Sequence, residues 1–104
     1  MKAHRILPEA LSELKQASTW YEEQRDGLCL ALVAEYRRRL ESALARPQAA
    51  SIAGKTPGGS DIRRFRLEGF RRYAILLATI HGVPTVLAFE HSSRKPGYWR
   101  ERLK

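Results

Sequence analysis

The C-terminal tail carries the densest mixture of aromatic and cationic side chains in the chain. Its two aromatic residues, Tyr98 and Trp99, are surrounded by cations at Arg94, Lys95, Arg100 and Arg102. Aromatic rings among cations can stack on nucleic-acid bases, and they can equally serve as buried anchors of a protein interface. The alternative is a tail that folds back onto the helices of the same chain. Both interpretations stay open at the level of the sequence.

Three further arginines precede the tail and bear on possible catalysis. Arg64 and Arg66 alternate along an expected strand, and Arg72 stands at the start of the next one. Metal-independent RNA cleavage needs a base for the 2′-hydroxyl, cations for the transition state and an acid for the leaving oxygen. Arginine suits the second role only, because a pKa above ~12 makes it a poor proton acceptor. The alternative is an ordinary solvated cationic face, as strand-surface charges usually are.

His91 is the histidine placed to titrate beside the cationic tail. Its parity with Leu87 and Phe89 predicts a residue at the edge of the core, hydrogen-bonded to the backbone. No two histidines, and no histidine–cysteine pair, have the spacing of metal ligands, so we expect no metal site. The isolated Gly58-Gly59 pair is no phosphate-binding motif, and we expect no cofactor.

Net charge restricts the classes of partner. The 104 residues include 19 basic and 11 acidic side chains, which gives a formal charge of +8. Residues 1–60 contribute +2 and residues 61–104 contribute +6. This balance favours polyanionic partners, namely nucleic acid, an anionic membrane or an acidic protein. We expect the surface that binds them to lie in the C-terminal part.

Length and cysteine content indicate one domain in a reducing compartment. A chain of this size has enough surface to bury for one modest core, so residues 1–104 are expected to form a single domain. Cys29 has no second cysteine with which to form an internal disulfide. The longest apolar run, Tyr73–Ala78, is far shorter than the ~18 residues of a membrane span, and the N-terminus has no apolar leader segment. We therefore expect a cytoplasmic protein that does not enter a membrane.

Periodicity predicts the elements that must position these side chains. Apolar residues recur every three or four positions in two segments that meet at Gly27, which predicts an αα-hairpin with Trp20 and Tyr36 in the core. From Asp61 the period changes to two. The loop between helices and strands has one large apolar residue, Ile52. The expected elements are a strand over 2–6, helices over 8–26 and 28–46, a surface loop over 47–60, and strands over 61–67, 72–79 and 85–91.

This order, β-α-α-β-β-β, predicts an α+β domain. An antiparallel meander sheet would have the αα-hairpin packed on one face, with the other face left to solvent or to a partner. After the sheet, Pro96 and Gly97 break the extended chain, and one helical turn is expected from Tyr98 onward.

Six short pieces, in order along nearly the whole chain, carry a family resemblance. They are Glu9–Leu14 with Trp20 and Tyr21; Gly27 and Leu28; Ile62–Arg64; Gly69–Tyr73; Val86–Phe89; and the set His91, Arg94, Pro96, Tyr98 and Trp99. Together they resemble the RelE/ParE family of toxins from bacterial type II toxin–antitoxin modules. The resemblance implies the RelE/ParE-like fold and a small cytoplasmic toxin of the kind associated with plasmid stabilisation. It also implies growth inhibition when the toxin is released from a cognate acidic antitoxin.

The two branches of the family differ in their target. ParE-like proteins poison DNA gyrase without an evident catalytic group, whereas RelE-like proteins cleave messenger RNA on the ribosome. The tail from His91 to Trp99 resembles the ParE branch more closely, and Ser92 stands where the ribonucleases usually carry a further arginine. A tyrosine common late in the second meander strand is replaced here by Leu76-Leu77, so any role of its hydroxyl is absent.

The expected function is therefore a ParE-like, non-enzymatic inhibitor of DNA gyrase. The first alternative is a metal-independent, ribosome-dependent endoribonuclease, whose catalytic residues would be Arg64, Arg66, Arg94 and Tyr98. The second is a non-toxic, basic nucleic-acid-binding module. The expected target-binding residues are Arg64, Arg66, Arg72, His91, Arg94, Lys95, Tyr98, Trp99 and Arg100. Expected partners are the antitoxin and either gyrase or the ribosome with its mRNA, and a homodimer or a toxin–antitoxin hetero-oligomer both stay open.

Overall fold

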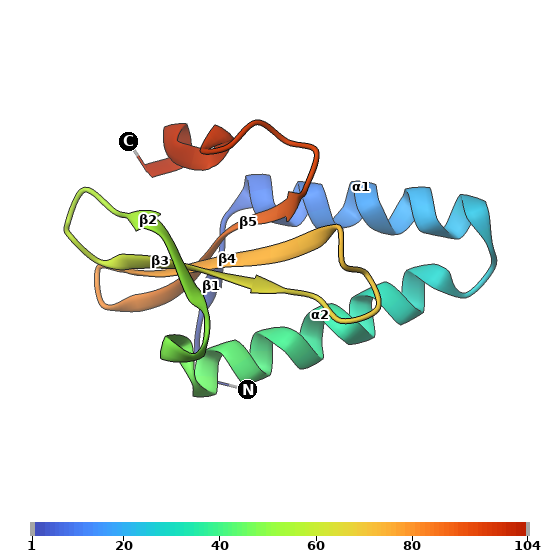
Figure 1. The fold of residues 1–104 in the computed structure, drawn as a ribbon. Helices are drawn as coiled ribbons and strands as arrows, with labels where there is room; N and C mark the ends of the chain where they lie inside the picture. Colours follow the sequence, from blue (N-terminus) through green and yellow to red (C-terminus); the bar gives the residue numbers. More distant parts are fainter. Residues whose placement is uncertain (1, 104) are drawn as a thin grey trace.

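The computed structural model describes residues 2–103 and shows an α+β fold (Figure 1). Met1 and Lys104, which the expected domain 1–104 includes, lie outside the described residues. The elements are β1 (Arg5–Ile6), α1 (Pro8–Gln24), α2 (Leu28–Ala45), the 3₁₀ turn η1 (Pro47–Ala49), β2 (Ser51–Lys55), β3 (Asp61–Arg66), β4 (Tyr73–Ile80), β5 (Val83–His91) and the 3₁₀ helix η2 (Tyr98–Leu103). None of the described helices is long and apolar enough to cross a membrane.

The five strands form one mixed sheet in the order β1-β5-β4-β3-β2. Strands β2 to β5 are antiparallel, but β1 runs parallel to β5, with Arg5 opposite Thr85. The prediction of a purely antiparallel sheet is therefore wrong. The two helices carry the chain across to the opposite side of the sheet, so the spatial neighbour of β1 is the last strand of the chain. This long-range pairing leaves no mark on the local periodicity of either strand.

The segment 47–60 is not the surface loop that its composition predicted. Strand β2 lies within it and pairs with β3 at the edge of the sheet, with a register shift between Ile52 and Gly54. Edge position explains the missed strand, because its side chains stay largely in water and Ile52 is 52% exposed. Gly54 lies beneath the Trp99 ring, which a Cβ at this position would touch at an ordinary contact distance of 3.5 Å.

The αα-hairpin is confirmed and covers one face of the sheet. In Figure 1 the helices join at the end of the molecule away from β2 and η2. Gly27 adopts a φ of +91° at the junction, and the Glu22 carboxylate accepts its backbone N–H. The core on this face is built of buried residues from both helices and three strands: Ala10, Leu14, Ala17, Leu32, Tyr36, Leu40, Ala43, Leu44, Phe65, Leu67, Ile75, Leu77, Val86 and Phe89. Tyr36 is in the core as predicted, but Trp20 is 54% exposed and its predicted burial is wrong.

The sequence predicted that the opposite face of the sheet would be left to solvent or to a partner. In the structure the tail covers much of this face. The tail folds back across it, and Trp99 is only 2% exposed there. A second buried cluster results, made of Ile62, Leu76, Ala78, Leu87, Ala88 and Trp99. The tail therefore packs on the sheet, and Tyr98 and Arg102 also contact Glu13 of helix α1. The alternation of β3 is as predicted, since Ile62 lies in this cluster and Phe65 lies in the core beneath the helices.

Candidate functional site

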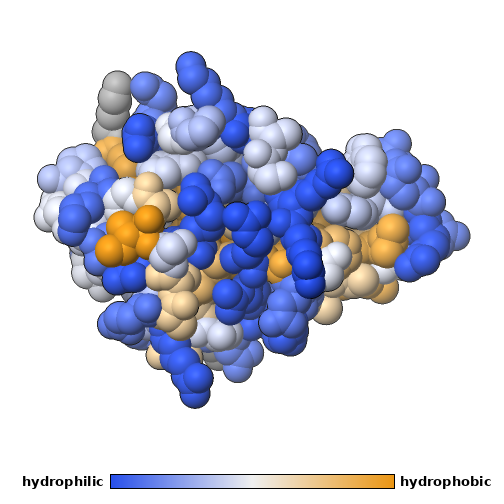
Figure 2. Space-filling view, viewed as in Figure 1, coloured by the Kyte–Doolittle hydropathy of each residue, from blue (hydrophilic) through white to orange (hydrophobic). Residues whose placement is uncertain are grey.

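Four of the predicted arginines converge on one shallow pocket of about 260 Å³. Arg64 and Arg66 reach it from β3, Arg72 from the turn before β4, and Arg94 from the tail after β5. The lining is completed by Ala74, Glu90, His91, Ser92 and Pro96. We call this the arginine pocket. Figure 2 shows how hydrophilic side chains dominate one face of the molecule, with hydrophobic atoms exposed between them.

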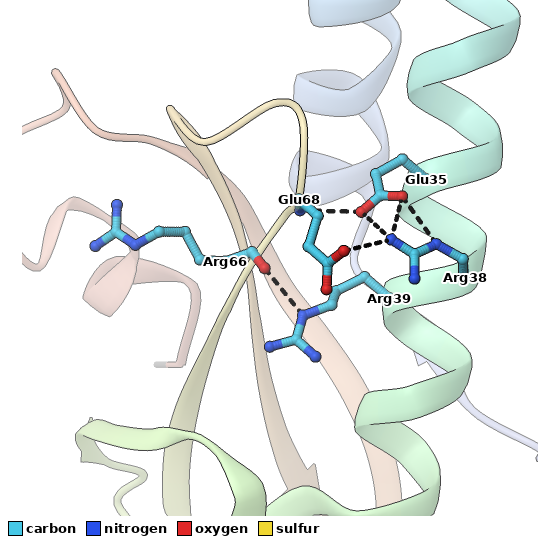
Figure 3. Close-up of polar contacts among 5 residues, drawn as sticks. All are labelled: Glu35, Arg38, Arg39, Arg66 and Glu68. Carbon is cyan, nitrogen blue, oxygen red and sulfur yellow. Dashed lines mark hydrogen bonds and ion pairs between the residues drawn. The ribbon is translucent and has the colours of Figure 1, made fainter.

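Helix α2 fixes the strand and turn that bear two of these arginines (Figure 3). Arg39 Nε donates a 2.9 Å hydrogen bond to the backbone carbonyl of Arg66. Glu35 accepts the backbone N–H of Glu68 at 2.9 Å, and Arg38 bridges the two carboxylates at 2.7 and 3.2 Å. The Arg66 side chain points away from this network and from α2. Arg38 and Glu68 are largely exposed and Glu35 is mostly covered, so the network serves to orient the turn more than to stabilise the fold.

One of the four guanidinium groups is already neutralised. Arg64 Nε and Nη2 donate to the two oxygens of Glu90 at 2.8 and 3.3 Å. The Glu90 side chain is 12% exposed and that of Arg64 31%, so the pair is partly withdrawn from water and fixes its geometry. Among residues 2–103, Arg66, Arg72 and Arg94 make no ion pair with a carboxylate. The pocket therefore keeps a positive charge of about three.

The tail is held in place by one carboxylate of α1. Glu13 accepts hydrogen bonds from the Tyr98 hydroxyl at 2.6 Å, from both Arg102 Nη atoms at 2.8 and 3.0 Å, and from the Phe89 backbone N–H at 3.1 Å. Burial, followed by the hydrogen bond to Glu13, raises the pKa of Tyr98. The same carboxylate raises the pKa of Arg102. Tyr98 is thus held as a hydrogen-bond donor, which makes it unsuited to proton transfer near neutral pH.

Arg94 connects the tail to the arginine pocket. Its guanidinium carbon lies 4.1 Å from the centroid of the Tyr98 ring, a cation–π contact that restrains the arginine without neutralising it. All four residues of the ribonuclease alternative, Arg64, Arg66, Arg94 and Tyr98, therefore belong to one contiguous surface.

His91 borders the arginine pocket at the end of β5. Its Nδ1 accepts the Ser93 backbone N–H at 3.0 Å and lies 2.7 Å from the Ser93 hydroxyl. The ring edge contacts Tyr73, with centroids 4.9 Å apart. The predicted hydrogen bond to the backbone is present. Because Nδ1 accepts, Nε2 is the nitrogen left for another partner.

Four predicted binding residues do not line the arginine pocket: Lys95, Tyr98, Trp99 and Arg100. Trp99 is buried beneath the tail, and its indole N–H has no hydrogen-bond partner among the described residues. Arg100 lies over the Trp99 ring, with its guanidinium carbon 5.6 Å from the centroid. Lys95 is exposed on the tail outside the pocket lining. Trp99 thus works as a structural anchor in this fold.

Two carboxylates that shape the site were missed by sequence reasoning. Glu13 falls on the polar side of an amphipathic helix, and Glu90 falls beside His91 in a strand. Their partners are distant in the sequence, since Glu13 binds Arg102 across 89 residues and Arg64 binds Glu90 across 26. The one local signal was a carboxylate in the otherwise apolar β5.

No group of three or more potential metal ligands is present within the described part of the chain. Comparison with family models, with curated proteins and with solved structures gave no match.

Proposed function

We propose that this protein is a ParE-like toxin that inhibits DNA gyrase by binding, and that a cognate antitoxin neutralises it. The observation that carries the proposal is the convergence of four arginines from three separate segments on one pocket. Three of them have no carboxylate partner among the described residues, which leaves a cationic surface for an anionic target. The RelE/ParE-like fold, the gyrase target and the cytoplasmic location all belong to this proposal.

The chemistry of the pocket supports binding in preference to catalysis. The Tyr98 hydroxyl donates to Glu13, and Glu90 is paired with Arg64. Arginine itself stays protonated and can stabilise negative charge without moving a proton. An inhibitor that docks on its target needs only the fixed cations.

The neutralising partner fits the same surface by charge. An acidic segment can pair with Arg66, Arg72 and Arg94 when it folds onto the domain, which would cover the arginine pocket. Antitoxin and target then compete for the same cations. This accounts for neutralisation without a second binding site.

The test is a supercoiling assay with purified gyrase. The full chain is expected to inhibit supercoiling at micromolar concentration, and the variant R66E is expected to lose at least tenfold in potency. Arg37→Glu is the matched control, because Arg37 is an exposed arginine of α2 away from the pocket. Unimpaired supercoiling with the wild-type chain would remove the proposal. Equal loss in R37E would show that net charge, and not the pocket, matters.

One observation favours the ribonuclease as the second candidate. His91 lines the arginine pocket, and an imidazole can exchange protons near neutral pH. Its Nε2 is the nitrogen that could serve as acid or base beside the arginines. After induction, primer extension on messenger RNA should then reveal new codon-phased ends that H91Q abolishes. Their absence would contradict this candidate.

A further inference from the structure

A second pocket adjoins the arginine pocket on the helix side of the sheet. It has a volume of about 210 Å³ and lies between α1 and the ends of β4 and β5. Four aromatic rings line it, together with polar groups of α1 and the tail: Trp20, Tyr73, Phe89 and His91, with Glu13, Gln16, Ala17 and Arg94. We call this the aromatic pocket. His91 and Arg94 line both pockets, so the two are adjacent.

We propose that the two pockets together bind one nucleoside monophosphate, with the base in the aromatic pocket and the phosphate in the arginine pocket. The proposal goes beyond gyrase inhibition and does not depend on it. It assigns a ligand to the aromatic pocket, which the binding of a macromolecular target leaves unexplained.

The aromatic pocket offers flat surfaces that suit a base. Tyr73 stacks on the buried Phe89 with ring centroids 4.7 Å apart and planes at 12°, and His91 meets Tyr73 edge-on, so these rings form a rigid floor and Trp20 is the ring with an exposed surface. Trp20 is held by an edge contact to Tyr21 at 5.0 Å, yet over half of it is exposed. Bases stack favourably on an exposed aromatic ring. The exposed indole is therefore explained by a planar ligand that covers it.

The arginine pocket offers the complement of a phosphate. A phosphate monoester carries a charge between about −1.5 and −2 at neutral pH, and guanidinium groups bind its oxygens in a fork geometry. Arg66, Arg72 and Arg94 have no carboxylate partner among residues 2–103. Arg94 lines both pockets and is restrained by the Tyr98 ring, so it lies where base and phosphate would be joined.

The combination favours a nucleotide over an acidic peptide. Carboxylate side chains would occupy the arginines but leave the neighbouring rings uncovered. The joint volume of the two pockets falls within the range of small-molecule sites, which is about 300–1,000 Å³. Gln16 also lines the aromatic pocket; its Nε2 donates to Ser12 Oγ at 3.4 Å, which leaves its amide oxygen and second N–H for a base edge.

The test is the equilibrium binding of AMP to the full chain, measured by calorimetry and by the quenching of tryptophan fluorescence. AMP is expected to bind at least tenfold more tightly than inorganic phosphate or adenosine, because each of these fills one pocket only. Trp20→Ala should reduce the AMP affinity to that of phosphate, and Arg72→Ala should reduce it to that of adenosine. The Trp20→Phe variant should still bind AMP, but its tryptophan fluorescence should no longer be quenched on binding. Arg37→Ala is the control for charge, and melting temperatures verify that the variants fold.

Two results would overturn the proposal: equal affinity for AMP and inorganic phosphate, or an AMP affinity unchanged by Trp20→Ala. The gyrase assay is a separate experiment. A chain that fails to inhibit gyrase can still bind AMP, and a chain that fails to bind AMP can still inhibit gyrase.

Discussion

The Glu13 carboxylate and the Tyr98 hydroxyl meet at 2.6 Å, although 85 residues separate them in the chain. Arg102 and the Phe89 backbone N–H donate hydrogen bonds to the same carboxylate. One side chain of α1 thereby ties together the helix, the last strand and the tail. The tail in turn buries Trp99 and restrains Arg94, so Glu13 controls the shape of the arginine pocket from outside it.

Removing Glu13 should release the tail. We expect Glu13→Ala to lower the free energy of unfolding by about 3 kcal/mol, because Arg102 is left partly buried without its partner. Urea unfolding measures the loss, and a red shift of Trp99 fluorescence reports the exposed indole. Glu23→Ala, an exposed position on the same helix, should change stability by less than about 0.5 kcal/mol. A loss below about 1 kcal/mol in E13A would argue against the tether.

Tyr36 should make the fold sensitive to alkali. Burial raises its pKa from 10.0 to about 12. Because the folded pKa is the higher one, the stabilisation is complete below pH 10 and is lost as the pH rises through about 12. A shift of this size corresponds to about 3 kcal/mol. Tyr36→Phe should therefore flatten the decline in unfolding free energy over this range, and equal slopes for the two proteins would refute the assignment. Burial and Glu13 also raise the pKa of Tyr98, so the ionisation of Tyr98 likewise lowers the free energy of unfolding at high pH.

The two tryptophans should differ sharply in their effect on stability. Trp99 is 2% exposed and fills the second cluster, so Trp99→Ala should cost about 3–5 kcal/mol. Trp20 is 54% exposed, and Trp20→Ala should cost less than about 1 kcal/mol. Chemical unfolding of both variants decides the matter. Similar losses would mean that the tail does not cover the sheet in solution.

Glu90 should lower the affinity of the arginine pocket for anions. Glu90→Gln removes the carboxylate from the arginine pocket and frees Arg64, so binding to a single-stranded oligonucleotide should tighten. The slope of log affinity against log salt should steepen by about the value of one phosphate contact. Glu41→Gln, exposed on α2, makes the same change in net charge elsewhere and should leave the slope unchanged. Identical behaviour of the two variants would show that Glu90 exerts no local effect.

Local pattern was sufficient for much of this fold. Period 3.6 predicted both helices and their junction at Gly27, and period 2 predicted β3 with Ile62 and Phe65 on opposite faces. The uneven charge predicted arginines gathered in the C-terminal part. Four of them do line one pocket, because β3 and β5 flank β4 in the sheet and the Ser92 backbone N–H after β5 donates to the Arg72 carbonyl before β4.

Tertiary structure alone decided the remainder. The edge strand β2 is recognised only by its pairing with β3, and the parallel pairing of β1 and the position of Trp99 depend on contacts between distant segments. The pairing of Arg64 with Glu90 and the four donors on Glu13 do so as well. Amphipathic period records which face of an element meets water, but two opposite charges attract only when strand register and helix packing bring them within reach. Sequence therefore determined which residues carry the charge, and packing determined which of those charges remain free.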